Sequence, residues 1–437
     1  MLRRALWWTA AFALIALPGE AESRTFLQLM TGDESIPPDA RSLALGKTRG
    51  ASTTGGFTAT GNPALLAHVQ RLEVAAGGGG NRLKESRSTP AYDSFDGFLV
   101  ESIYVLNQNW NTDGAFGAAA MPFEEGELAK LGLGVAYSPL WDYRYDYFEQ
   151  VRDPNAFTQP RDDLIGINDI ESNGRLEAWS FGAGYDVHEW LDLGATFQWA
   201  YGDHDLLART WFVRPDSTVS GELALSSLSG PRWTLGGVVT PHHSVSVSGH
   251  WRSKMRLEGD FELAGDASYL AFLGDLAGTS TSGEAVVTYP QEVGLGVTWR
   301  PRAKVETTIQ GELNWRDWSK YENSIFESPQ LRSVWDARFG IEHRFYNDMP
   351  VRFGFAYEPS PQDRQVTTTS FTFGGGYEFG PAIMDLGFEI TNRQYRFGDV
   401  FDDAAFGGNT RTVTDEVDET TTGVYATLHW ATNTFGS

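Results

Sequence analysis

The feature that most limits what this chain can fold into is an alternation of apolar and polar residues with a period of two. Within 304–318 the two faces separate cleanly, with Val305, Ile309, Leu313 and Trp315 on one and Glu306, Gln310, Glu312 and Asn314 on the other. A period of two is the repeat of a β-strand, in which successive side chains point to opposite faces. Each such strand meets an apolar phase on one side and a wet one on the other.

The polar faces carry charges of both signs, and the apolar faces carry aromatic residues. Within 334–345 the expected outward residues are Trp335, Ala337, Phe339, Ile341 and Phe345, and the expected inward ones are Asp336, Arg338, Glu342 and Arg344. A soluble β-sandwich would bury the same apolar face, and one strand alone does not distinguish the two folds. The 15 Trp, 16 Tyr and 27 Phe favour a membrane barrel, which has aromatic girdles and a polar interior.

Fourteen segments of this kind follow one another along the chain. They are 71–83, 114–123, 131–147, 174–187, 190–203, 231–240, 243–257, 285–299, 304–318, 334–345, 350–358, 367–379, 382–396 and 421–431. The number is even, as in single-chain bacterial outer-membrane barrels. We therefore expect an all-β fold, a transmembrane antiparallel β-barrel of about 14 strands.

The connections between these segments alternate between short and long. The short ones are 124–130, 188–189, 241–242, 300–303, 346–349 and 380–381. Outer-membrane barrels have short periplasmic turns and longer extracellular loops. With an even strand number, both chain termini are expected on the periplasmic side.

Residues 1–21 have the pattern of a secretory signal peptide. Arg3 and Arg4 precede an apolar run, and small residues lie before an expected cleavage after Ala21. A membrane anchor is the weaker reading, because the run is shorter than the roughly 20 residues a spanning helix needs. The chain has no cysteine, which excludes disulfides, thiol catalysis and Cys-based metal sites.

The formal net charge of −23 excludes nucleic acid as a partner, since no basic stripe is present to neutralise phosphates. Much of the acid lies in the long connections, such as 148–172 and 396–420. We interpret these as solvated loops, because none has the residue spacing of an EF-hand. His242 and His243 fall in a short turn and are read as solvated, so no metal site is expected.

Catalytic motifs are missing from the sequence. It contains neither a GxSxG elbow nor an HExxH pair. The enzymatic alternative is a membrane hydrolase with a serine and a histidine at the barrel rim. His429, on the last expected strand, faces inward by parity, whereas a lipid-facing site needs the opposite. We expect no enzyme activity and no cofactor.

Upstream of the strands, the stretch GNPALL is neither a strand nor a full helix. Asn62 is held extended by Pro63, and Ala64, Leu65 and Leu66 are free to start a helical turn. Read alone, the stretch is a turn dipeptide followed by a few apolar residues.

Several stretches together resemble the FadL-like outer-membrane transporters of long-chain fatty acids (OMPP1/FadL/TodX), which include aromatic-hydrocarbon uptake channels. The similarity covers about 40–430. It rests on NPALL at 62–66, SVSGHWRSKMRLEGDFE at 246–262, YPQEVGLGVTWRP followed by NWRDWSKY at 314–321, and VRFGFAYEPSP at 351–361 followed by FTFGGGYEFG. The first outside loop, 85–113, departs from the family by containing the strand-like piece GFLVESIYVL.

The resemblance implies a division of the chain and a transport route. After the signal peptide, 22–70 would form a hatch inside the lumen, with residues 62–66 as the hatch motif. Residues 71–431 would form the barrel and 432–437 a C-terminal extension. A hydrophobic ligand would be captured by the loops, pass the hatch and leave sideways into the outer membrane. The alternatives are a docking or shuttle subunit for secreted proteins and an open porin for polar solutes.

Two groups of residues are candidates for this route. Gly132, Gly134 and Pro139 lie in the third strand, and a proline without an N–H interrupts the ladder, so they are the candidate lateral exit. The candidate contacts for a ligand headgroup in the lumen are Arg338, Arg316 and Arg344, although wall charges also need partners of their own. The expected partners are a fatty acid or hydrocarbon and membrane lipid, and the expected state is a monomer.

Overall fold

The computed structural model describes residues 25–35, 39–50, 55–92, 95, 97–123, 125–153, 163–301, 306–327, 329–346, 348–407 and 411–432. The expected signal peptide and residues 433–437 of the expected C-terminal extension lie outside this part of the chain. Among the described residues, no helix is both long enough and apolar enough to cross a membrane.

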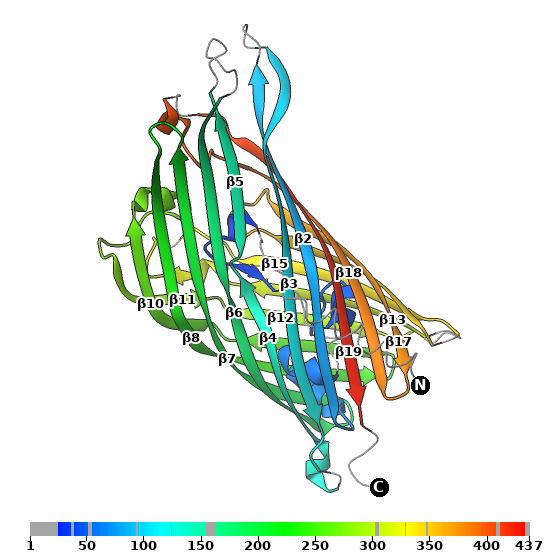
Figure 1. The fold of residues 1–437 in the computed structure, drawn as a ribbon. Coiled ribbons are helices and arrows are strands. Elements are labelled where there is room, and N and C mark those ends of the chain that lie inside the picture. The colour runs from blue at the N-terminus through cyan, green and yellow to red at the C-terminus, as the bar shows by residue number, and fades with distance from the viewer. Residues whose placement is uncertain are drawn as a thin grey trace, which may run out of the picture.

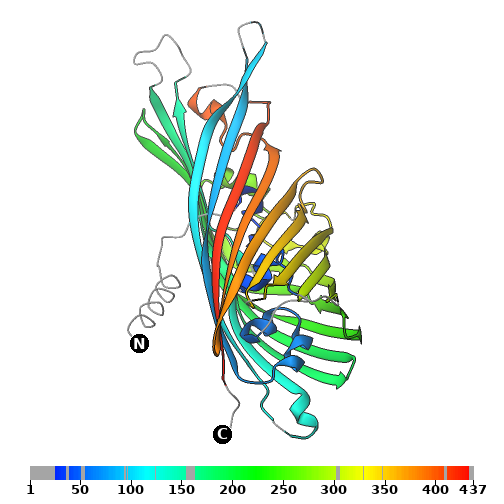
Figure 2. The same ribbon diagram turned by 90° about the vertical axis from the view of Figure 1, so that its right-hand side faces the viewer.

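The described strands form one antiparallel sheet that closes when β19 pairs with β2 (Figures 1 and 2). The bounds of the wall strands are β2 (Glu73–Tyr92), β3 (Phe98–Ala120), β4 (Leu131–Asp142), β5 (Tyr145–Arg152), β6 (Leu164–His188), β7 (Leu191–Phe212), β8 (Ser217–His242), β9 (Val245–Arg252), β10 (Met255–Gly265), β11 (Ser282–Tyr289), β12 (Glu292–Trp299), β13 (Thr307–Arg316), β14 (Glu322–Asn323), β15 (Val334–Arg344), β16 (Pro350–Pro359), β17 (Thr367–Phe379), β18 (Ala382–Phe397) and β19 (Asp415–Ala431). In four places two successive strands share one crossing of the wall: β4 with β5, β9 with β10, β11 with β12, and β13 with β14. The wall thus has the fourteen expected strands.

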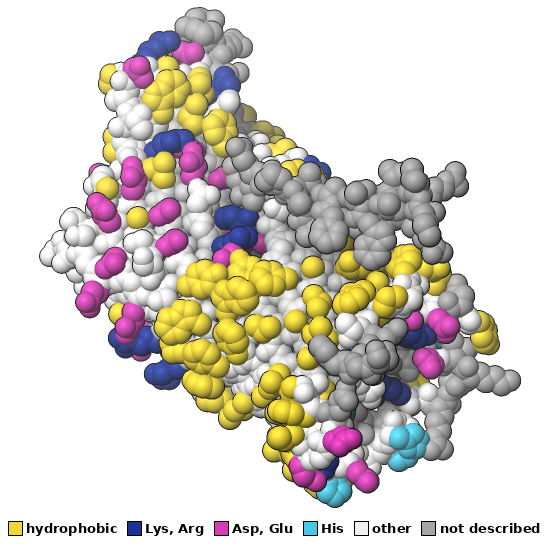
Figure 3. Space-filling view, turned by 60° about the horizontal axis from the view of Figure 1, so that its bottom comes forward, with side chains coloured by type: hydrophobic (Ala, Val, Ile, Leu, Met, Phe, Trp, Pro, Cys, Tyr) yellow, Lys and Arg dark blue, Asp and Glu magenta, His cyan; other side chains and the backbone are white. Residues whose placement is uncertain are grey.

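The two faces of the wall differ as predicted. On β13 and β15 the outward side chains of Leu313 and Trp335 are exposed, whereas Glu312 and Arg338 are buried inside. Figure 3 shows apolar side chains gathered on the outer surface, with charged side chains toward its edges. The assignment of Glu306 was wrong, because it precedes β13 and is exposed. Val305 lies outside the described residues.

The strands continue much farther at the long-loop end than expected. β2 and β3 extend to Tyr92 and Phe98 and absorb the strand-like piece of the first loop (Figure 1). The expected loops 148–172 and 396–420 likewise contain parts of β5, β6, β18 and β19. Residues 98–103 of β3 are exposed on both faces, and farther along the strand its buried face carries Val105 followed by asparagines, so the clean apolar and polar alternation of 304–318 is absent there.

The segment before β2 lies against the inner face of the wall. It contains η1 (Phe26–Gln28), β1 (Asp33–Glu34), α2 (Ala40–Ala44), η2 (Gly55–Thr60) and η3 (Pro63–His68). η3 contacts β4, β6, β7 and β8, η2 contacts β2 and β3, and α2 contacts β16 to β19. Four further short helices, η4 (Glu127–Lys130), η5 (Ala267–Leu273), η6 (Trp318–Lys320) and η7 (Asp403–Phe406), lie in connections. We call residues 25–70 the N-terminal segment.

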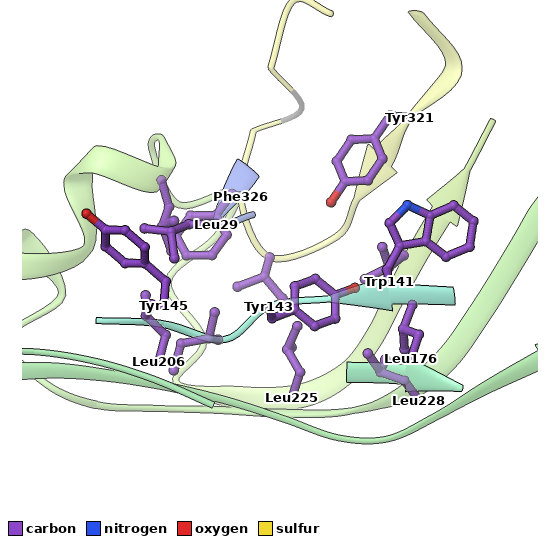
Figure 4. Packing of buried hydrophobic residues seen from close by; sticks show 14 of the residues in the cluster. Leu29, Trp141, Tyr143, Tyr145, Leu176, Leu206, Leu225, Leu228, Tyr321 and Phe326 are labelled. Atoms are coloured by element: carbon purple, nitrogen blue, oxygen red, sulfur yellow. The ribbon is translucent and has the colours of Figure 1, made fainter. Parts of the chain in front are cut away.

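The expected polar lumen is found nearer the short turns, whereas toward the long loops the interior mixes apolar residues with buried charges such as Glu85 and Arg87. Toward the long loops, buried residues of the wall, the N-terminal segment and the loops form one apolar cluster (Figure 4). A bulge contributes to this change. The pairing of β8 with β7 shifts from Leu228 opposite Gly202 to Leu225 opposite His204. This shift turns Leu225 and Leu223 inward, where they are buried.

Candidate functional site

The NPALL motif forms the turn that fixes the N-terminal segment at the short-turn end of the lumen. Asn62 caps η3, its Oδ1 accepting a hydrogen bond from Ala64 N at 3.1 Å, and Pro63 occupies the first turn. The Asn62 amide also donates to Gly237 O and Gly249 O, each at 3.3 Å. Since Asn62 is fully buried, it links the segment to β8 and β9.

Glycines on four wall strands lie directly under η3, and we call them the glycine seat: Gly132 and Gly134 on β4, Gly184 on β6, Gly194 on β7 and Gly236 on β8. A Cβ at Gly132 would lie 1.9 Å from Leu66 O, and one at Gly236 would lie 2.0 Å from Asn62 Oδ1. At Gly194 it would lie 2.4 Å from Pro63 C. Backbone of the segment therefore rests directly on backbone of the wall, at a distance that side chains would prevent.

Ion pairs attach the next part of the N-terminal segment to the opposite wall. Arg41 Nε lies 2.9 Å from Glu342 Oε2, and Lys47 Nζ lies 2.5 Å from Glu389 Oε1. Arg352, which is buried, bridges Glu342 at 2.6 Å and Asp385 at 2.5 Å. Buried charges need such partners, and here they belong to both the N-terminal segment and the wall.

Three side chains near α2 could offer ligands to a metal ion. One atom each of Asp39, Asp385 and His429 lies within 4.8 Å of the other two. The two carboxylates already accept hydrogen bonds, Asp39 from Arg41 N and Ser42 Oγ and Asp385 from Arg352. We interpret the group as a polar contact between segment and wall.

The ladder between β3 and its neighbour is interrupted where β4 bends. β3 pairs with β4 over five residues only, Phe116–Ala120 opposite Leu133–Tyr137. On its other edge β4 pairs with β6 throughout, but the register shifts between Pro139 and Trp141 and leaves Leu140 unpaired. Pro139 thus lies just beyond the end of the β3 ladder. Gly132 and Gly134 pair regularly with β6 and belong to the glycine seat instead.

Side chains and the N-terminal segment cover this interruption. Inside the lumen, β1 pairs with the bent part of β4, Asp33 opposite Asp142 and Glu34 opposite Trp141. Between β3 and β5, amides take the place of backbone pairs: Asn109 Nδ2 donates to Asp146 O at 3.1 Å. The polar groups freed by the bend therefore have partners that are not part of the barrel ladder.

A cavity of about 140 Å³ lies beside β1, and its lining has two chemical characters. The apolar part contains Leu27, Trp141, Trp318 and Val334, and the charged part contains Asp33, Glu34, Lys47, Arg49, Arg316, Asp336, Arg338, Glu358, Glu389 and Arg393. Trp141, Trp318 and Val334 also belong to the apolar cluster, so the cavity lies at its polar boundary. Figure 4 shows Trp141 beside Tyr143 in that cluster.

Of the three arginines predicted as headgroup contacts, Arg338 and Arg316 line the cavity. Arg344 lies at the end of β15 and pairs with Glu378 at 3.3 Å, away from the cavity. Glu34, Arg49 and Trp141 were missed. The first two lie in a segment without strand periodicity, and Trp141 follows the bulge that breaks the alternation of β4.

Glu34 is the centre of the charge network in the cavity. Its carboxylate contacts Arg316, lies 3.1 Å from Arg49 Nη1 and lies 3.6 Å from Arg338 Nη2. Burial alone would raise the pKa of Glu34, but Arg316, Arg49 and Arg338 outweigh burial and hold the pKa well below its usual range. The three arginines therefore favour the ionised form of the Glu34 carboxylate.

At the end of η3, His68 makes a contact that is expected to depend on pH. Its Nε2 lies 2.9 Å from Asp192 Oδ2, and this hydrogen bond raises the pKa of His68 above its usual value. The contact stabilises the segment fully below about pH 6.5 and is lost as pH rises through the raised pKa. We expect faster proteolysis of residues 55–70 at pH 9 than at pH 6, with no such difference in His68→Ala. Equal pH dependence in both proteins would contradict this role.

The chain is similar to known outer-membrane proteins in sequence and in fold. The family model described as outer membrane protein transport protein (OMPP1/FadL/TodX) matches residues 177–396. No curated protein matches the chain. Among solved structures, a Pseudomonas aeruginosa FadL homologue is similar at 12% identity and a TM-score of 0.62, covering 92% of this chain and 100% of that one.

Two further solved structures have the same fold. The P. putida toluene transporter TodX has 12% identity, a TM-score of 0.63 and coverage of 92% of this chain and 100% of its own. The Ralstonia pickettii toluene transporter TbuX has 13% identity, a TM-score of 0.55 and coverage of 91% and 99%. The fold agrees with the family match, which spans half of the chain. The chain belongs to the outer membrane protein transport protein family (OMPP1/FadL/TodX), whose members are outer-membrane channels for hydrophobic compounds.

Proposed function

We propose that this channel takes up amphiphilic hydrophobic molecules, long-chain fatty acids first among them, by passive passage through the outer membrane. The observation that carries the proposal is the cavity in which Trp141 and Trp318 face Arg316 and Arg338. An apolar tail fits the cluster next to Trp141, and a carboxylate fits beside the arginines. A pure hydrocarbon would use only the first of these two surfaces.

In the proposed route, the apolar cluster beneath the long loops receives the ligand tail. The N-terminal segment acts as the hatch, and the interrupted ladder at Pro139 is the lateral exit. Opening an intact ladder toward lipid would expose unpaired N–H and C=O groups, which costs several kcal/mol per group. At Pro139 the β3 ladder has already ended, so exit requires only the rearrangement of side chains and β1.

A neutral aromatic hydrocarbon is the second candidate ligand. Two structural relatives are described as toluene transporters, and Tyr143, Tyr289 and Trp318 lie in the apolar cluster. The N-terminal segment lies inside the lumen against the wall, which disfavours an open porin. A docking or shuttle subunit would bind its partner at the surface and would not require the interior apolar cluster.

Uptake assays separate these functions. Cells that express the protein are expected to take up [¹⁴C]oleate faster than cells with the gene deleted, and Asn62→Ala is expected to lose most of this gain. Removing the Asn62 side chain deletes a buried cap and two hydrogen bonds, which costs about 2 kcal/mol of segment docking.

The control is a gel in which the unheated and the heated Asn62→Ala protein are compared. A change of migration on heating shows that its barrel is assembled. [¹⁴C]Toluene uptake without oleate uptake would favour the second candidate. If deleting the gene changes neither uptake, the transport proposal is overturned.

A further inference from the structure

We infer that Glu34 is a built-in substitute for a ligand carboxylate, and that an anionic ligand opens the lateral exit by displacing it. The inference rests on the proposed function and adds how the ligand would act on the N-terminal segment. The probe chemistry is a long-chain carboxylate.

The first step of the argument is where the Glu34 carboxylate lies. It occupies the charged side of the cavity, in contact with Arg316, Arg49 and Arg338 from three directions. Arg316 and Arg338 come from the wall, on β13 and β15, whereas Glu34 comes from the N-terminal segment. A carboxylate held between arginines is the arrangement that a bound fatty acid headgroup would adopt.

The second step is that a ligand carboxylate and Glu34 would compete for the same place. The wall arginines have further partners of their own, since Arg316 Nε lies 2.9 Å from Glu292 and Arg338 Nη2 lies 3.0 Å from Glu358. With those neighbours in place, a second carboxylate beside Glu34 would add an uncompensated negative charge in a buried site. Entry of the ligand headgroup is therefore coupled to departure of Glu34.

The third step is what Glu34 holds when it is in place. Glu34 is half of β1, and β1 pairs with Trp141 and Asp142 in the bent part of β4, next to Pro139. Ser35 N donates to Leu140 O at 2.9 Å, which extends the same cover over the bulge. When Glu34 leaves the arginines, β1 keeps, within the described part of the chain, only the longer ion pair between Asp33 Oδ1 and Arg393 Nη2 of β18, at 3.7 Å. The two-residue strand β1, Asp33 and Glu34, thus both occupies the headgroup position and covers the exit.

The test compares oleate with methyl oleate, which has the same chain and no charge. Binding to the purified protein is followed by quenching of tryptophan fluorescence, since Trp141 and Trp318 line the cavity. In Glu34→Gln, which removes the competing charge and keeps the size, we expect at least about fivefold tighter oleate binding and unchanged methyl oleate binding. In Arg338→Met we expect weaker oleate binding, again with methyl oleate unchanged.

Glu378→Gln is the charge-matched control, because Glu378 pairs with Arg344 away from the cavity, and it should bind both ligands as the wild type does. Weaker or unchanged oleate binding in Glu34→Gln would overturn the inference while leaving the proposed function intact. If the wild type binds neither oleate nor methyl oleate, the proposed function itself fails.

Discussion

Gly194→Val is expected to expel the N-terminal segment from the lumen while the barrel still assembles. The new Cβ would lie 2.4 Å from Pro63 C and 2.5 Å from Ala64 N, and both are backbone atoms that cannot turn aside. Valine is a good strand residue, so β7 itself does not suffer. With this clash, the docked state can no longer make the Asn62 hydrogen bonds or bury Leu66, which together contribute about 3 kcal/mol or more. The ratio of docked to undocked segment therefore falls roughly 100-fold.

The measurement is ion conductance through the purified protein in planar bilayers, which should rise from a low level to that of an open pore. Gly237→Val is the matched control. Gly237 lies on the neighbouring strand, and its Cβ would meet only ordinary contacts, the nearest at 3.4 Å from Leu193. Unchanged conductance in Gly194→Val, with a normal barrel, would show that the segment does not block the lumen.

Pro139→Val combined with deletion of Leu140 is expected to abolish ligand exit. Valine restores the missing N–H, and the deletion removes the residue that has no partner on β6. With the interruption repaired, lateral exit requires breaking ladder hydrogen bonds in lipid at several kcal/mol, which lowers [¹⁴C]oleate uptake about a hundredfold or more. Oleate binding to the purified variant should persist, since the charged side of the cavity is unchanged.

Leu140→Ala is the control for this experiment. It keeps the unpaired residue and the hydrogen bond that Leu140 O accepts from Ser35 N, and it should transport as the wild type does. Full uptake by the double variant, with the repaired ladder verified in its structure, would place the exit elsewhere.

The strands of the wall were predictable because the membrane imposes a pattern on them. Every one of the fourteen expected segments overlaps a strand, and the side-chain directions at Glu312, Trp335 and Arg338 were correct. The same physics explains the errors. Residues 98–103 of β3 are exposed on both faces, so this end of the strand has no alternation that could have predicted it.

The inside of the barrel was harder to predict than its wall. The sequence indicated Asn62 as a polar anchor and placed Arg316 and Arg338 in the lumen, and the structure agrees. It could not place Glu34 beside them, because 282 residues separate Glu34 from Arg316 and no periodicity orients the N-terminal segment. It also assigned Gly132 to a kink in the wall. A glycine that lets another backbone approach and a glycine that bends a strand look alike in sequence.

The contacts of the N-terminal segment also determine the order in which the protein can assemble. Ala40 N donates to Thr427 Oγ1, 387 positions away and near the end of the last strand, and η3 rests on four different strands. Contacts of such long sequence separation form late, because the intervening chain must first be ordered. Ala40 can make this contact only after β19 has formed. We therefore expect the wall strands to form before the N-terminal segment docks, so that the first described residues are the last to find their partners.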